Sequence, residues 1–285
     1  MKFPAFEYAA PATLAEAVAL LAAGRGAAKV LAGGQSLLPT MAFRLATPAM
    51  LIDIGKLEEL RKITIGAEGV RLGARTRWRD IEDDARLQSA HPLLRAAVSH
   101  VAHYQIRNRG TVGGSLAHAD PAAEMPGIAV TCDAEIKVLG PKGERVIPAG
   151  KFFTGALSTT LADDEIIVEV RLPAWPAQRR WGFEELSPRR GDFALAGIAA
   201  FYDLDASGKA ANTHIGVIGA CIRPHRIAQA EAALNSRTVD EAAIQATARA
   251  AEEALDPPSD LHASAAYRRS LAGTLLERAL QRASH

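Results

Sequence analysis

The pattern of apolar positions along the chain predicts a mixture of helices and strands. Residues 13–23 (TLAEAVALLAA) have helical spacing behind Thr13, and Glu16 completes the capping box of a helix N-terminus. Similar spacing predicts helices at 91–102, 227–234, 240–255 and 261–282. Short apolar or alternating runs between turn residues predict strands at 29–32, 50–54, 63–65, 70–72, 134–139, 145–147, 166–172, 181–186, 194–204 and 213–219.

Residues 173–176, Pro-Ala-Trp-Pro, interrupt this pattern. Proline lacks a backbone N–H and its ring fixes φ, so the segment cannot easily continue a strand or a helix. We therefore predict a domain boundary there, with one domain over 1–175 and a second over 176–285. The three strands predicted beyond the boundary are expected to pair antiparallel, and helices follow them in the sequence.

Composition narrows the class of protein. The 285 residues are enough for two packed units, and 48% hydrophobic with 23% charged residues is the balance of an ordinary globular protein. The 33 Lys and Arg against 32 Asp and Glu leave a formal charge of +1, so we expect no nucleic-acid partner. The apolar runs are too short to span a bilayer, and no signal peptide opens the chain. We therefore expect a cytoplasmic protein without a membrane span.

Metal-binding side chains are scarce. Cys132 and Cys221 lie far apart, so they cannot supply a disulfide framework or the thiolates of an iron–sulfur cluster. His100 and His103 resemble half of a metal site on a helix, but no third ligand stands nearby and a structural pair is the simpler interpretation. No catalytic triad, nucleophile elbow or paired-carboxylate site is recognisable. Any redox metal is therefore expected in another chain.

Two glycine motifs carry the clearest candidate chemistry. The first, Leu31–Leu37 (LAGGQSL), follows a predicted strand, and Gly33 and Gly34 leave no Cβ between backbone N–H groups and an anion. Ser36 adds a hydroxyl donor. The spacing matches neither the dinucleotide fingerprint nor the phosphate-binding lysine loop. Taken alone, the Gly-Gly pair is more often a simple turn after a strand than a ligand site.

The second motif, Thr111–Ser115 (TVGGS), repeats this design and is predicted to be a loop. Two such loops can hold a pyrophosphate through converging backbone amides and hydroxyls with few basic side chains, which fits the near-zero net charge. Asp120 follows and could accept hydrogen bonds from ribose or ribityl hydroxyls. The alternative for Asp120 is an Asp-Pro turn starter.

Three further residues stand near these motifs. Arg107 and Arg109 precede the second motif, and we leave them out of the site because arginines beside a turn usually only solvate it. Phe193 is the best aromatic candidate for packing against a planar ring, although a lone phenylalanine at the start of a strand is usually core.

The motifs, with residues around them, closely resemble a known family. The second motif lies within RNRGTVGGS (107–115), and Asp120-Pro121 and Glu124-Met125-Pro126 follow it. Further matches are FPAFEY (3–8), RLATP (44–48), DEI (164–166), GDFA (191–194), RP (223–224) and YR (267–268). In order and spacing they resemble the medium, FAD-binding subunit of molybdenum hydroxylases, the group of xanthine dehydrogenase, carbon monoxide dehydrogenase and quinoline oxidoreductase. The resemblance covers nearly the whole chain.

The resemblance implies an α+β fold. Residues 1–175 would form an FAD-binding region of the vanillyl-alcohol-oxidase (PCMH) type, with two subdomains at about 1–55 and 56–175. Residues 176–285 would form a smaller C-terminal domain of the carbon monoxide dehydrogenase flavoprotein type, with a three-stranded antiparallel sheet and helices.

The resemblance also implies that this chain binds FAD. The residues expected around the pyrophosphate and the sugar chain are Leu31, Ala32, Gly33, Gly34, Gln35, Ser36, Leu37, Thr111, Gly114, Ser115 and Asp120. Those expected around the flavin ring are Val101, Ala102, Leu161 and Phe193. No catalytic side chain and no metal ligand is expected, because the flavin carries the chemistry.

Five positions depart from the pattern frequent in the family. Gln35 replaces a histidine, and Ser115 and His118 replace asparagines, but all three can still form hydrogen bonds. Phe193 replaces a tyrosine and removes a phenolic hydroxyl. Glu185 stands where xanthine dehydrogenase-like members have a flavin-contacting lysine. The last two changes bear on the flavin potential and the final electron acceptor.

The function that the resemblance implies is that of an oxidoreductase subunit in a heterotrimer or a dimer of heterotrimers. A large molybdopterin subunit would oxidise the substrate, a small subunit would relay electrons through two 2Fe–2S clusters, and FAD would pass them to an external acceptor. Residues 1–6 and 109–120 look more like members that hydroxylate N-heterocycles, while carbon monoxide and thioesters stay possible. The alternatives are a stand-alone flavin reductase resembling the enolpyruvyl-sugar nucleotide reductase, and a non-catalytic nucleotide-binding module.

Overall fold

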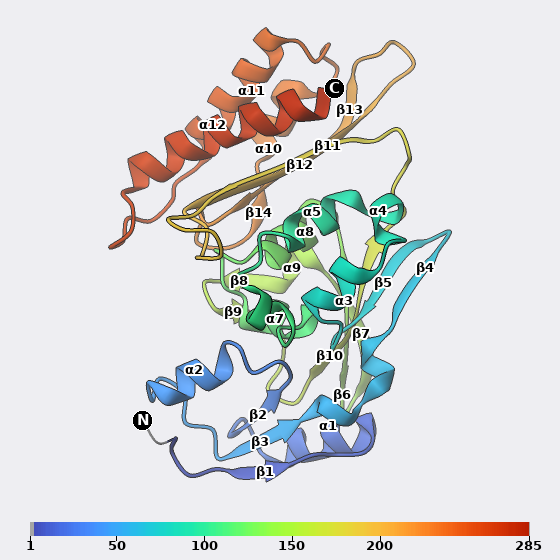
Figure 1. Ribbon diagram of the computed structural model, residues 1–285, viewed down its shortest axis with the longest axis vertical. Helices are drawn as coiled ribbons and strands as arrows, with labels where there is room; N and C mark the ends of the chain where they lie inside the picture. The colour runs from blue at the N-terminus through green and yellow to red at the C-terminus, as the bar shows by residue number, and fades with distance from the viewer. Residues whose placement is uncertain (1–2, 285) are drawn as a thin grey trace.

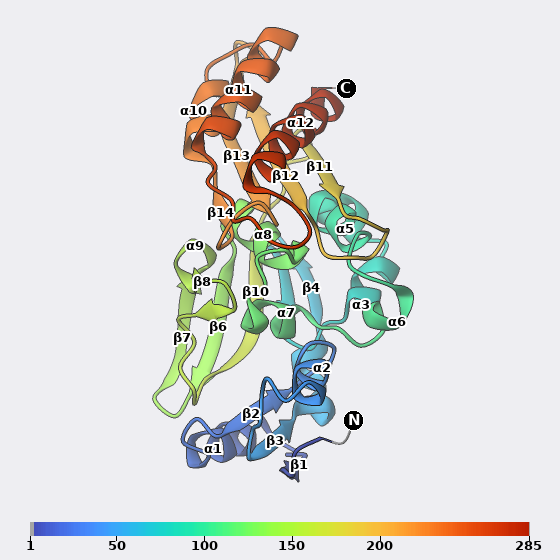
Figure 2. The same cartoon turned by 90° about the vertical axis from the view of Figure 1, so that its left-hand side faces the viewer.

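The computed structural model describes residues 3–284, and three main sheets follow one another along its long axis (Figures 1 and 2). The N-terminal sheet is parallel, in the order β1 (Glu7–Ala9), β3 (Met50–Asp53), β2 (Ala28–Leu31). Helix α1 (Leu14–Ala23) connects β1 to β2. As the sequence predicts, Thr13 caps α1, since its side chain accepts the Glu16 N–H at 3.2 Å. The short α2 (Leu37–Ala42) precedes β3.

The central sheet is antiparallel and supports most of the short helices. Its order is β4 (Ile63–Gly66), β5 (Gly69–Gly73), β10 (Ile166–Pro173), β6 (Glu135–Gly140), β7 (Gly143–Pro148). The 3-10 turns η1 (Ile54–Lys56) and η2 (Glu58–Arg61) lead into it. Between β5 and β10 the chain also forms α3 (Trp78–Asp83), α4 (Leu87–Ala90), α5 (Pro92–Val98), α6 (Tyr104–Arg107), α7 (Val112–His118), α8 (Glu124–Thr131), α9 (Ala149–Phe152) and the hairpin β8 (Phe153–Gly155) with β9 (Ser158–Thr159).

The C-terminal sheet is antiparallel, in the order β11 (Arg180–Leu186), β12 (Ala196–Leu204), β13 (Ala210–Ile218), β14 (His225–Arg226). The expected three strands are present, and the two-residue β14 is added to them by pairing with the end of β13. Helices α10 (Ala228–Leu234), α11 (Glu241–Ala254) and α12 (Ala265–Ser284) follow. Two polar residues behind a proline carry no strand signal, which is why the sequence did not predict β14.

Strand β12 is apolar from Ala196 to Tyr202, where both of its faces are buried. Ile198 and Tyr202 belong to the cluster formed with α10, α11 and α12, whereas Ala199 and Phe201 belong to the core of the central sheet. A strand buried on both faces reads as a continuous apolar run instead of an alternating one. This strand therefore joins the C-terminal sheet to the rest of the molecule.

The structure corrects three predictions from the sequence. The helix predicted for 91–102 ends at Val98, and β1 and α8 were not predicted at all. The second glycine motif is not a loop, because α7 begins at Val112 and includes both glycines. Thr111 caps this helix, as its hydroxyl oxygen accepts the Gly114 N–H at 3.2 Å. Tertiary packing here outweighs the poor helix propensity of glycine.

No helix within residues 3–284 is both long and apolar enough to cross a membrane.

Candidate functional site

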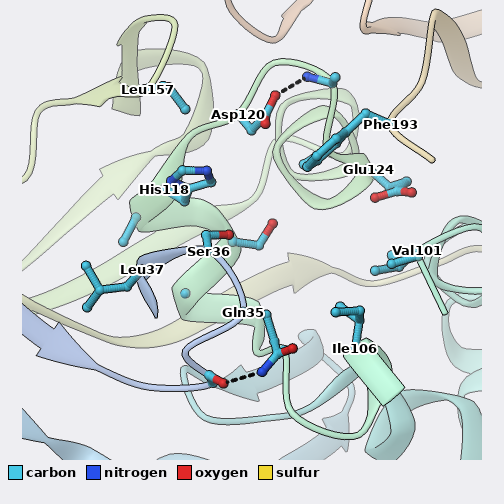
Figure 3. Close-up of a pocket in the computed structure, with 18 of the residues that line it drawn as sticks. Gln35, Ser36, Leu37, Val101, Ile106, His118, Asp120, Glu124, Leu157 and Phe193 are labelled. Carbon is cyan, nitrogen blue, oxygen red and sulfur yellow. Dashed lines mark hydrogen bonds between the residues drawn. The ribbon is translucent and has the colours of Figure 1, made fainter. Parts of the chain in front are cut away.

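A cavity of about 1340 Å³ opens between the three main sheets, and the predicted site residues gather around it (Figure 3). The predicted residues that line it are Ala32, Gly33, Gly34, Gln35, Ser36, Leu37, Val101, Ala102, Thr111, Gly114, Ser115, Asp120, Leu161 and Phe193. Leu31 is the exception, since it ends β2 behind the first motif and does not reach the cavity. The cavity thus brings together segments that are far apart in the sequence.

The first motif forms a loop whose backbone donors are free. Within residues 3–284, the N–H groups of Gly33–Leu37 donate no hydrogen bond to another protein group. Ser36 stands at the N-cap position of α2, yet its hydroxyl makes no capping hydrogen bond. Unpaired donors in a partly buried loop need an outside partner. Five consecutive donors beside a cavity therefore fit an anionic group such as a pyrophosphate.

Glycine is required in this loop for two separate reasons. A Cβ on Gly33 would collide with the backbone carbonyl oxygen of Arg109, so Gly33 lets the loop contact the segment before α7. Gly34 has a φ of +73°, a conformation that L side chains rarely adopt. Gln35 holds the turn by donating from Nε2 to the Gly33 carbonyl at 2.9 Å. The shape of the loop is thus set by contacts within the protein.

The second motif contributes hydroxyl groups but no backbone cradle. The Val112 N–H donates to Thr76 O at 2.9 Å, and the Gly113 N–H donates to Ala74 O at 2.8 Å. With the Gly114 N–H on the Thr111 hydroxyl, the first-turn donors of α7 are all paired. The prediction that amides from both motifs converge is therefore wrong for the second one. The two motifs are nevertheless adjacent, since a Cβ on Gly114 would lie 3.9 Å from the Ala32 Cβ.

Asp120 forms the turn that the sequence allowed and also lines the cavity. Its Oδ1 accepts the Ala122 N–H at 2.9 Å, which is the turn that the Asp-Pro pair predicted (Figure 3). This bond occupies one carboxylate oxygen and fixes the side chain at the cavity wall. The second oxygen stays available to accept a hydrogen bond from a sugar hydroxyl.

A strained turn after α5 forms the apolar end of the cavity. Val101 and Ala102 line it, and Ala102 has a φ of +39°. Arg107 holds this turn, because its Nη1 donates to the Val101 carbonyl at 2.9 Å and to the Ala102 carbonyl at 3.1 Å. Nε of the same guanidinium lies 3.0 Å from a Glu82 carboxylate oxygen. Arg107 therefore positions the wall and does not reach for a phosphate.

Phe193 belongs to the cavity and not to the core. Strand β12 begins only at Ala196, and 65% of the Phe193 surface is exposed, so the interpretation as a core residue is wrong. Its loop lies against the turn after α5, since a Cβ on Gly191 would collide with the His103 ring. A large exposed ring beside a cavity is available to stack on a planar ligand.

Several lining residues escaped prediction from the motifs. Ile106, His118, Glu124 and Leu157 are the clearest examples (Figure 3). Glu124 and His118 stand inside the stretch that carries the resemblance, so position alone pointed to them. Leu157 follows no motif, and its φ of +53° is visible only in the structure.

Arg268 stabilises the part of the cavity wall that the C-terminal residues form. Its guanidinium is buried and donates to the carbonyls of Leu195 at 2.6 Å and Gly219 at 3.2 Å. Asp260 accepts from the same group at 2.7 Å, and this bond lowers the pKa of Asp260 to about 2. Arg268 thus ties α12 to the loop that carries Phe193.

The two cysteines and the histidine pair form no redox-metal site. Cys132 and Cys221 are free and buried, and burial raises the pKa of each thiol to about 12. Nowhere in the described part of the chain do three or more His, Cys, Asp or Glu side chains gather in a way that could hold a metal ion. His103 lines the cavity, while His100 faces Glu185 on β11.

Known proteins share this architecture over the full length of the chain. Residues 4–175 match the FAD binding domain in molybdopterin dehydrogenase, and residues 181–283 match the CO dehydrogenase flavoprotein C-terminal domain. The 6-hydroxypseudooxynicotine dehydrogenase complex subunit alpha of Paenarthrobacter nicotinovorans is 38% identical over 285 residues, which are 100% of this chain and 96% of that protein.

Solved structures agree with this match. A chain of carbon monoxide dehydrogenase from Hydrogenophaga pseudoflava, in a form that lacks the Mo-pyranopterin moiety, superposes with a TM-score of 0.96 at 39% identity, covering 100% of this chain and 99% of that one. A chain of quinoline 2-oxidoreductase from Pseudomonas putida 86 gives a TM-score of 0.94 at 38% identity and covers 100% and 98%. The chain therefore belongs to the family of FAD-binding medium subunits of molybdenum hydroxylases, which are oxidoreductase complexes.

Proposed function

We propose that this chain is an electron-transfer subunit that holds one FAD noncovalently in the cavity between its three main sheets. The free N–H groups of Gly33–Leu37 are the observation that carries the proposal. They suit the phosphate oxygens of a dinucleotide without any lysine or arginine in the loop. The domains proposed for this role are 1–175, with subdomains at about 1–55 and 56–175, and 176–285.

The other cavity residues divide by chemistry. The hydroxyls of Ser36, Thr111 and Ser115, with the free oxygen of Asp120, suit the polar sugar and phosphate part of the cofactor. Val101, Ala102, Leu161 and Phe193 suit the flat and largely apolar flavin ring. Bound FAD would supply electron transfer, while the protein supplies position and exclusion of water.

Electrons enter from neighbouring chains in this proposal. A large molybdopterin subunit oxidises the substrate, two 2Fe–2S clusters of a small subunit relay the electrons, and an external acceptor takes them from this chain. Support comes from a relative named as the subunit of a complex and from the absence of a metal-binding cluster within residues 3–284. The assembly we propose is a heterotrimer, or a dimer of heterotrimers, in the cytoplasm.

The substrate class we propose is an N-heterocycle. The resemblance of residues 1–6 and 109–120 supports it, as do the names of two similar proteins, 6-hydroxypseudooxynicotine dehydrogenase and quinoline 2-oxidoreductase. The test is to purify the complex through this chain, identify the co-purifying subunits, and offer N-heterocycles and carbon monoxide anaerobically. Bleaching of the flavin by carbon monoxide alone would contradict the proposed class.

Noncovalent retention of FAD is the first prediction. The purified chain is expected to be yellow, and acid or heat is expected to release all of the flavin as FAD. The reason is that neither glycine motif, LAGGQSL or TVGGS, contains a residue suited to a covalent flavin link. Absorbance of the supernatant and chromatography against FAD and FMN standards check this. Colour that stays with the precipitate, or release of FMN, would contradict it.

Ser36→Ala is expected to weaken FAD binding mildly. The Ser36 hydroxyl makes no capping bond in the protein, so its removal costs one ligand hydrogen bond and little stability. One such bond contributes about 1 kcal/mol, which is roughly a fivefold change in Kd. Equilibrium titration of the flavin-free variant measures the change, and its unfolding midpoint is the control. An unchanged Kd would place Ser36 outside the binding surface.

A further inference from the structure

Glu185 on β11 carries a buried carboxylate without a cationic partner. Only 3% of its side chain is exposed, and its Oε2 has no hydrogen-bond partner within the described residues. Buried carboxylates are normally paired with arginine or lysine. The neighbouring Glu184 follows that rule, with a carboxylate oxygen 2.8 Å from Arg282 Nε. Glu185 is therefore a place where a proton, in place of a cation, neutralises the charge.

A second carboxylate, Glu124, links Glu185 to the cavity. Glu124 is the first residue of α8, and Figure 3 shows its side chain on the side of the cavity where Val101 and Phe193 lie. Burial raises the pKa of Glu124, and the Asp120 carboxylate adds to this. Burial likewise raises the pKa of Glu185, and the Glu124 carboxylate adds to that. The two carboxyls therefore titrate as an interacting pair.

His100 lies between this pair and solvent. Its Nδ1 is 3.9 Å from Oε1 of Glu185, and 41% of its side chain is exposed. The imidazole packs edge-on against Phe183, with ring centroids 5.0 Å apart, and lines a separate surface cavity of about 430 Å³. Burial lowers the pKa of His100, as do Arg190 and Arg282 nearby. Both shifts favour the neutral forms of His100 and Glu185 and so disfavour an ion pair between them.

We propose that Glu124 and Glu185 hold an exchangeable proton at the wall of the FAD cavity, and that His100 connects this proton to solvent. The proposal rests on the proposed function for its purpose, because reduction of a flavin consumes a proton. Geometry supplies the surroundings of each group: Glu124 lines the cavity, Glu185 is buried with His100 Nδ1 3.9 Å from its Oε1, and His100 reaches the surface.

The proton balance is simple. Bound FAD would supply two-electron chemistry, and each reduction would need one proton, which the pair of Glu124 and Glu185 would give up. One proton from solvent would then reprotonate the pair through His100. The proton taken from the pair would leave again when the acceptor withdraws the electrons, so that the cycle is balanced. Asp120 on the cavity side favours the protonated pair, and Arg190 and Arg282 keep His100 neutral between transfers.

The pair itself is tested without cofactor. In the flavin-free protein with carbon-13-labelled Glu carboxyls, NMR is expected to show two carboxyls that titrate well above the ordinary value for glutamate. Glu185→Gln removes one of these titrations and lowers the other, while Glu184→Gln leaves both in place. If every Glu in the wild-type protein titrates at the ordinary value, the pair does not exist. This result would not depend on whether the chain binds FAD.

The pH dependence of the free energy of unfolding is a second test of the same pair. Because the native pKa values are raised, the native state binds more protons than the unfolded state once the pH exceeds about 4.5, the ordinary value for glutamate. The free energy of unfolding is therefore expected to fall as the pH rises from there to above neutral. Glu185→Gln flattens this fall and Glu184→Gln does not. Equal slopes in all three proteins would contradict the proposal.

Proton uptake during reduction tests the role of the pair. FAD-loaded protein is reduced photochemically in weak buffer with a pH-indicator dye, just below the pH at which the pair titrates. Wild-type protein is expected to take up one proton promptly, and Glu185→Gln and His100→Phe are each expected to take up the same number more slowly, because the reduced flavin keeps the proton and the relay changes only how fast it arrives. Identical uptake and rate in all variants would overturn the relay. Loss of FAD from wild-type protein would instead contradict the proposed function.

Discussion

Gly33→Ala is expected to destabilise the folded chain and to abolish FAD retention at the same time. The added Cβ would meet the backbone carbonyl of Arg109, and a backbone atom cannot rotate away as the end of a side chain can. The loop must then move away from the segment before α7, and overpacking of this kind costs about 1–3 kcal/mol. The same movement displaces the free N–H groups of Gly33–Leu37.

The measurement is a pair of titrations, of denaturant unfolding on the flavin-free protein and of FAD on the folded protein. Gly150→Ala is the matched control, because no atom lies within 4 Å of a Cβ at that position. The control is expected to leave both quantities close to those of the wild type. Wild-type stability in the Gly33 variant would mean that the two segments are not held in contact as described.

How far the sequence predicts the fold depends on how local the determining interaction is. Helix α1 was predicted because Thr13 and Glu16 lie within one turn of each other. Strand β14 has two residues and exists only because β13 lies beside it, so no local pattern marks it. The same holds for α7, in which Gly113 is required by close contact with Ala74, a residue in the turn after β5. A Gly-Gly pair predicts a turn unless that contact is known.

In the candidate site too, features that are local in the sequence were predicted, and features that depend on distant residues were not. The glycine motifs and the family resemblance together named many of the residues that line the cavity, although Leu31 is not among them. The sequence did not show which backbone donors are free, since that depends on partners such as Thr76 and Ala74 that precede the second motif by many residues. Arg107 was rightly left out of the site, but its contacts with the Val101 and Ala102 carbonyls appear only in three dimensions.

Gly114→Val is expected to lower FAD affinity strongly while the chain remains folded, in contrast to the Gly33 variant. A Cβ at Gly114 meets one side-chain atom, Thr111 Oγ1 at 2.8 Å, and otherwise lies 3.9 Å from the Ala32 Cβ. The protein therefore tolerates it at the cost of a weakened helix cap, about 1 kcal/mol. The valine methyls extend into the cavity between the two motifs, where the phosphates are expected.

Displacement of the pyrophosphate is expected to break at least two charge-assisted hydrogen bonds to the loop of Gly33–Leu37. At about 1.5 kcal/mol each, their loss raises the Kd for FAD roughly a hundredfold. Fluorescence titration of the flavin-free variant measures the Kd, and circular dichroism with the unfolding midpoint confirms the fold. Gly114→Ala should fall between wild type and Gly114→Val, since it adds the Cβ alone. If the valine variant binds FAD with wild-type affinity, the phosphates do not lie between the two motifs, and the cofactor must occupy the cavity in another orientation.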